Sequence, residues 1–128
     1  MDVLLKIHSG TRWLVAGVVL LALIKLLSTW LRRSEFGSGD RGLLSAAVGL
    51  IDLQVLIGIV LAIGLGGFPR PRMEHVVTML LAAVAAHSTA RFKRADGTTR
   101  ARNSFLLLLV AAVLIAVGVI RLRGGWMF

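Results

Sequence analysis

The sequence predicts an all-α membrane protein whose four transmembrane helices form an up-down-up-down bundle, with residues 1–128 as a single domain. Three observations predict this fold. Of the 128 residues, 57% are hydrophobic and 16% are charged, whereas an ordinary soluble domain has about 45–50% apolar and about 25% charged residues. The apolar residues form four runs, and short polar segments separate them. Because a helix needs roughly 20 residues to cross the hydrocarbon core, four spans use most of the chain.

Each apolar run corresponds to one expected span. The four spans are Trp13–Trp30, Leu43–Leu65, Met73–Arg91 and Phe105–Ile120. We expect the first helix to start well before Trp13, with Asp2 as its N-cap, and the fourth to extend over Asn103–Leu122. The connections are Arg32–Gly42, Gly66–Arg72 and Arg91–Arg102. These connections are short, which favours antiparallel neighbours.

The positive charges predict an orientation in the membrane. The net charge is +9, but it is concentrated in the connections and at the chain ends, so membrane topology explains it better than nucleic-acid binding. The first and third connections together hold eight lysines and arginines, three plus five, against six at the termini and in the second connection. We therefore expect the first and third connections in the cytoplasm and both termini on the opposite side of the membrane. The first span is expected to be retained as a signal anchor.

Several functional classes are excluded. The chain has no cysteine, which excludes disulfides, thiolate metal sites and a cysteine nucleophile. It has no glycine-rich phosphate loop, and Glu74-His75 lacks the second histidine that a zinc-protease helix requires. Whether the chain is an enzyme stays open, although an electron-transfer or accessory role is favoured.

Two histidines are expected at matching depth in the membrane. His8 lies one to two turns into the first helix, and His75 lies near the start of the third. Odd-numbered helices start on the same side, and neutral imidazole is a good iron ligand, so His8 and His75 are the expected metal ligands of one haem b. Met79, Ala82 and Ala86 follow His75 on one helical face. Met79 is a further cofactor-binding candidate, and the two alanines leave room for a macrocycle or for close helix packing.

Three arginines flank these histidines. Arg12, Arg70 and Arg72 are expected to hold the haem propionates, because guanidinium binds carboxylate in a bidentate manner. The alternative is that the histidines lie at the interface and reach for water, while the arginines contact lipid headgroups.

Asp52 is the most costly residue in the expected spans. It lies about nine residues, or roughly 13 Å, into the second helix, and Gln54 points about 200° away from it. A carboxylate in hydrocarbon must be protonated, paired or placed in a polar cavity, and Lys25 or the backbone is a possible partner. His87 lies about 18 Å along the helix from His75, without a histidine at its depth. Asp52, Lys25 and His87 are candidates for proton transfer, quinone binding or a partner contact; the alternatives are a structural Asp52–Lys25 tie and a plain helix-end histidine.

Three motifs carry a resemblance to a known family. They are His8-Ser9-Gly10-Thr11-Arg12-Trp13, Asp52-Leu53-Gln54 with Leu56 and Gly58, and Glu74-His75 with Met79. The chain resembles a bacterial family of small four-helix membrane proteins often labelled cytochrome b or left uncharacterised. More distantly, it resembles four-helix membrane cytochromes b that hold haem between histidines. The resemblance covers the first three spans and implies haem ligation at His8 and His75 only.

The predicted function is that of a b-type cytochrome-like membrane subunit, which exchanges electrons with a quinone pool or a partner complex. The alternative is a cofactor-free accessory subunit of a respiratory or photosynthetic complex, or a variant in which a histidine binds chlorophyll magnesium. A transporter or proton channel at Asp52 and Lys25 is disfavoured, because the sequence shows no inverted repeat. The expected partners are the lipid bilayer and other membrane subunits or further copies of this chain.

Overall fold

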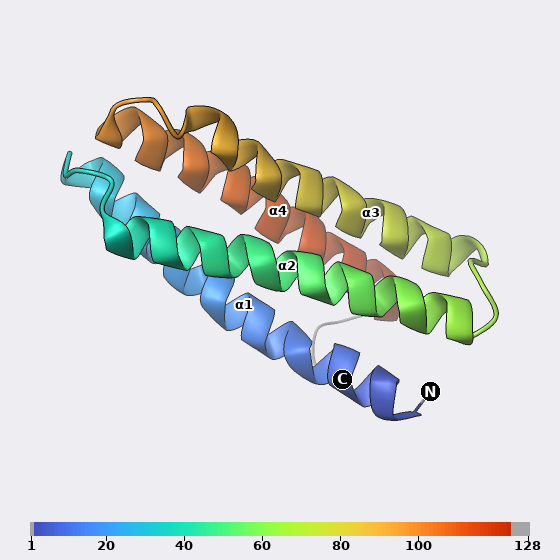
Figure 1. The fold of residues 1–128 in the computed structure, drawn as a ribbon. Coiled ribbons are helices and arrows are strands. Elements are labelled where there is room, and N and C mark those ends of the chain that lie inside the picture. The colour runs from blue at the N-terminus through green and yellow to red at the C-terminus, as the bar shows by residue number, and fades with distance from the viewer. Residues whose placement is uncertain (1, 124–128) are drawn as a thin grey trace.

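The structure is a computed structural model that describes residues 2–123, and within this range it is helical without strands. The elements are α1 (Asp2–Leu31), α2 (Ser38–Gly64), α3 (Arg70–His87), the 3-10 helix η1 (Ser88–Phe92) and α4 (Gly97–Arg123). The four long helices lie lengthwise side by side (Figure 1). Helix α1 packs against α2 and α4, and α3 packs against the same two helices. The all-α prediction is confirmed, and α1 and α3 occupy diagonal positions in the bundle.

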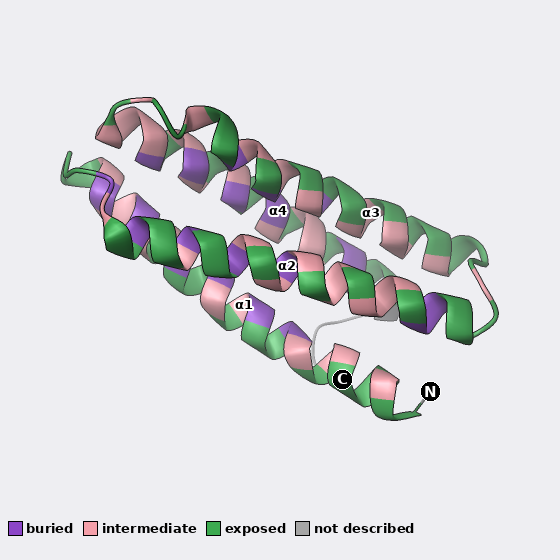
Figure 2. Ribbon diagram, in the orientation of Figure 1, coloured by how far each residue is buried: buried purple, intermediate pink, exposed green. Residues whose placement is uncertain are grey.

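Three of the helices are long and apolar enough to cross a membrane: α1, α2 and residues 97–122 of α4. Many large apolar residues of these helices are exposed, and Figure 2 shows exposed residues, in green, along α1 and α2. Exposed apolar surface of this extent is suited to contact with lipid. Helix α3 has only 18 residues and carries Arg70, Arg72 and Glu74 within its first five positions. It is therefore not among the spans that the structure supports.

The first residues of α1, α2 and α4 differ from the predicted ones, as does that of α3. Helix α1 does start well before Trp13, but Asp2 is itself helical and is not the N-cap, so that expectation is wrong. Helix α2 starts at Ser38 rather than near Leu43, and α4 starts at Gly97 rather than near Asn103. The first turns of α2 and α4 are polar. Because the helices are predicted from apolar runs, these turns are assigned to the connections.

The start of α4 is held by a side-chain cap. The Oδ1 atom of Asp96 accepts a hydrogen bond from the backbone N–H of Thr99 at 2.9 Å, and Oδ2 accepts one from the Thr99 hydroxyl at 2.9 Å. This is the arrangement that satisfies free N–H groups at a helix start. The same two hydrogen bonds hold the pKa of Asp96 below its usual range.

Helix α3 is displaced from its predicted boundaries. The prediction of one helix over Met73–Arg91 is wrong at both ends, because α3 starts at Arg70 and its α-helical part ends at His87, where η1 begins. Between α2 and α3, Gly66 and Gly67 have φ angles of 104° and 101°. Glycine adopts this backbone region without the clash that a Cβ atom would cause.

The core relies on small side chains that let the helices approach closely. Fully buried alanines occur on all four helices: Ala22, Ala47, Ala82, Ala86, Ala101 and Ala111. Small residues at helix contacts allow close backbone approach in membrane bundles. Of the two roles expected for Ala82 and Ala86, the structure therefore shows close packing and not space for a macrocycle. The larger side chains Leu26, Ile51 and Leu108 are fully or almost fully buried in the same core.

Candidate cofactor cavity

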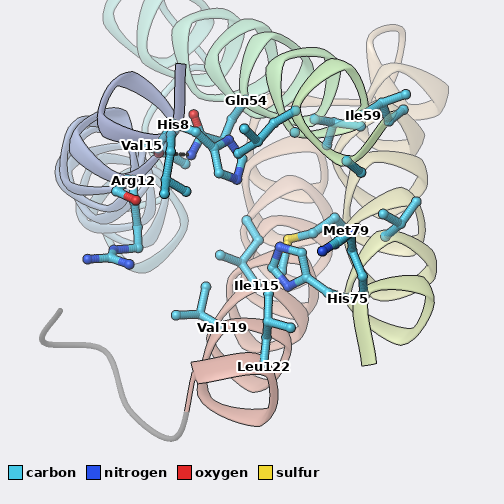
Figure 3. A pocket seen from close by; sticks show the side chains of 18 of the residues that line it. His8, Arg12, Val15, Gln54, Ile59, His75, Met79, Ile115, Val119 and Leu122 are labelled. Carbon is cyan, nitrogen blue, oxygen red and sulfur yellow. Dashed lines mark hydrogen bonds between the residues drawn. The ribbon is translucent and has the colours of Figure 1, made fainter. Parts of the chain in front are cut away.

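A mainly apolar cavity of about 160 Å³ lies at the end of the bundle that contains the start of α1 and the α2–α3 connection. It is lined by residues of all four long helices. They include His8, Arg12 and Val15 from α1, Gln54 and Gly58 from α2, Arg72, His75 and Met79 from α3, and Ile115 and Val119 from α4. The two histidines therefore enter one space from diagonal helices, and Figure 3 shows their rings on facing sides of it.

The ring of His75 is oriented by a backbone carbonyl of α4. Its Nδ1 atom lies 3.1 Å from the carbonyl oxygen of Gly118. Because a carbonyl oxygen only accepts hydrogen bonds, Nδ1 is the donor in this contact. Metal-binding histidines show this arrangement, in which one nitrogen donates to a carbonyl and the other binds the metal. A Cβ atom at Gly118 would overlap the Met79 methyl group, so the glycine also makes room for Met79.

The ring of His8 packs against the backbone of α2. A Cβ atom at Gly58 would lie 2.9 Å from Cε1 of His8 and 3.5 Å from its Nε2, so only glycine fits there without a shift of the ring. Gln54, one turn earlier on α2, donates a hydrogen bond from its Nε2 to the His8 carbonyl oxygen at 2.5 Å. The Thr11 hydroxyl donates to Oε1 of Gln54. Helix α2 thus holds both the backbone and the ring of His8.

Gln54, Gly58 and Gly118 are functional candidates that the sequence reading did not single out as site residues. The position of Gln54, about 200° from Asp52, was the available signal for an inward-facing amide. Nothing in the sequence indicates that Gly118 contacts a site residue, because glycine occurs in apolar helices for many structural reasons.

Two of the three arginines expected at a cofactor reach the cavity. Arg12 lines it and is only 7% exposed. Arg72 also lines it, and its Nη1 donates to the carbonyl oxygen of Gly67 at 2.6 Å. The side chain of Arg70 is instead 91% exposed and lies 3.7 Å from the Glu74 carboxylate. The structure therefore does not bring Arg70 to this cavity.

Lys25 pairs with an acid other than the predicted one. Its Nζ lies 3.3 Å from Oδ2 of Asp40, which is fully buried and also accepts hydrogen bonds from Thr29 at 2.6 Å and from the Gly37 N–H at 2.9 Å. The predicted Lys25–Asp52 tie is wrong. Because α2 starts earlier than expected, Asp40 lies on its first turn beside Lys25, while Asp52 is twelve residues, or about 18 Å, further along the helix.

Asp52 pairs with His87 on the outside of the bundle. His87 Nε2 lies 2.6 Å from Asp52 Oδ2, and the two side chains are 58% and 44% exposed. Asp52 is 14 residues beyond the first residue of α2, or about 21 Å, rather than the expected nine residues. His87 is the last residue of α3 and contacts Asp52, and neither side chain lines the cavity.

In residues 2–123, no three histidine, aspartate or glutamate side chains form a group that could hold a metal ion alone. A haem would need fewer protein ligands than a bare metal ion, because its porphyrin already coordinates the iron. Comparisons of this chain with models of known families, with curated proteins and with solved structures found no match.

Proposed function

We propose that this protein is a b-type cytochrome-like membrane subunit that binds one haem between His8 and His75. In this proposal it exchanges electrons with a quinone pool or with a partner complex. The observation that carries the proposal is that the imidazoles of two diagonal helices enter the same apolar cavity. Each ring is also fixed by a glycine of a neighbouring helix, Gly58 for His8 and Gly118 for His75.

The residues at the cavity fit the chemistry of the group. The contact of His75 Nδ1 with a backbone carbonyl orients the ring, as is common for metal-binding histidines. Arg12 and Arg72 supply guanidinium groups for the propionates, and Met79 forms part of the wall. Haem, when bound, supplies a one-electron redox centre. Typical ligand pockets have about 300–1,000 Å³, whereas this cavity has about 160 Å³. Haem binding therefore requires a wider cavity than the one between these helices in the structure.

The proposal includes the finer topology of the bundle. Helix α3 is the fourth span, its polar first turn lies at the membrane surface, and η1 extends it on the other side. The four spans run up-down-up-down. Eight lysines and arginines in the first and third connections, against six elsewhere outside the spans, support a cytoplasmic position for those connections. The termini and the cavity then lie toward the periplasm of a bacterial cytoplasmic membrane.

The test is a reduced-minus-oxidised visible spectrum of the full chain, with pyridine haemochrome analysis. We expect a haem b spectrum from the unaltered protein and its loss in His8→Ala and His75→Ala. The matched control is His87→Ala, because His87 is the third histidine of the chain and does not line the cavity. Absence of haem from the unaltered protein, or a full spectrum in His75→Ala, would refute the proposal.

A second candidate is a cofactor-free accessory subunit of a larger membrane complex. The small cavity and the outward-facing apolar side chains favour it. Purification of the chain together with larger membrane subunits, without haem or extractable chlorophyll, would support this candidate. A stable, monodisperse and redox-active isolated chain would argue against it.

A further inference from the structure

An acid–base pair lies on the outer surface of the bundle, away from the cavity. Asp52 on α2 and His87 at the end of α3 meet at 2.6 Å between Oδ2 and Nε2. Both side chains stay about half exposed, at 44% and 58%. The hydrogen bonds of the described residues use neither Asp52 Oδ1 nor His87 Nδ1. The pair therefore presents one acceptor oxygen and one imidazole nitrogen to whatever surrounds the bundle.

This position is costly for a purely structural contact. Asp52 lies near the middle of α2, which is long and apolar enough to span a membrane. A carboxylate that faces hydrocarbon costs several kcal/mol unless it is paired, and ionisable residues in spans usually mark functional sites. In the Lys25–Asp40 contact between α1 and α2, the carboxylate is fully buried and only the lysine stays partly exposed. The Asp52–His87 pair instead leaves half of each side chain accessible.

The surroundings of the pair are apolar. Leu56 lies four residues after Asp52 and Val84 three residues before His87, spacings that place them on the same helical faces. Both are exposed. A ligand suited to this site would have a polar head for the pair and an apolar part for these side chains.

We propose that the Asp52–His87 pair binds the headgroup of a membrane quinol. A quinol combines a lipid-soluble body with hydroxyl groups, and the carboxylate accepts a hydrogen bond from one of them while the imidazole contacts the headgroup beside it. Asp52 lies six residues, or about 9 Å, along α2 from Gly58, which packs against His8. This inference rests on the proposed function, in which a haem between His8 and His75 would receive the electrons of the quinol. Binding of the headgroup itself needs no haem.

The test measures binding in the absence of haem. The full chain is reconstituted in lipid nanodiscs and titrated with decylubiquinol under anaerobic conditions, with equilibrium dialysis as the readout. We expect saturable binding that weakens at least tenfold in Asp52→Asn and in His87→Gln. Glu74→Gln is the matched control, because Glu74 is another half-exposed carboxylate in ion pairs, with Arg70 and Arg121, and lies outside the proposed site. It should bind as the unaltered chain does.

A photoreactive azidoquinone identifies the site without any substitution. Labelling of α2 around Asp52 or of α3 around His87 supports the proposal, even if a variant is unstable. Labelling of the cavity instead, absence of saturable binding, or cross-linking of this surface to another protein overturns it. The two proposals fail separately: His8→Ala should abolish a haem spectrum while quinol binding persists.

Discussion

The contact between His8 and Gly58 allows a sharp prediction for Gly58→Ala. The new Cβ would lie 2.9 Å from Cε1 of His8, which is shorter than the ordinary contact distance of 3.4–4 Å. Overpacking of this kind costs about 1–3 kcal/mol. Alanine gains about 1 kcal/mol over glycine in a helix interior. The expected net change is a loss of stability of about 0–2 kcal/mol.

Gly49→Ala is the matched control, because Gly49 lies on the same helix and a Cβ there meets nothing within 4 Å. It keeps the helix-propensity gain without the clash, so the difference in free energy of unfolding between the two variants isolates the His8 contact. That difference should be about 1–3 kcal/mol. Unfolding in dodecyl sulfate, followed by tryptophan fluorescence and circular dichroism in the same detergent, measures it. Equal stability of the two variants would refute the close contact.

Three further predictions concern other contacts. Gln54→Leu removes the hydrogen bond to the His8 carbonyl and should lower the free energy of unfolding by about 1–3 kcal/mol; an unchanged value in the same detergent assay would contradict this. A double-mutant cycle with Lys25→Met and Asp40→Asn should show a coupling of about 0.5–3 kcal/mol, whereas strict additivity would mean that the two side chains do not interact. The Asp96 cap should be present above the ordinary aspartate pKa and be lost as pH falls through its lowered folded pKa. Amide hydrogen exchange at the start of α4 measures this, and Asp96→Asn should remove the pH dependence.

Much of the candidate site was visible in the sequence because depth in a span follows from counting residues. His8 and His75 both lie near the starts of odd-numbered helices, and the structure brings them to one cavity. Their neighbours were less predictable. Arg72 reaches the cavity while Arg70, two residues earlier, turns outward toward Glu74. The direction of a side chain in a first helical turn depends on where the helix starts, and α3 starts earlier than its apolar pattern indicates.

The sequence alone determined the all-helical fold and the membrane-like character of the chain, because composition and apolar run length are local properties. Tertiary structure decided which polar groups meet. Lys25 pairs with Asp40 and Asp52 with His87 because the polar first turn of α2 shifts every later residue along the bundle axis. Such pairings depend on the height and rotation of a neighbouring helix, and neither quantity is encoded in the pattern of one segment.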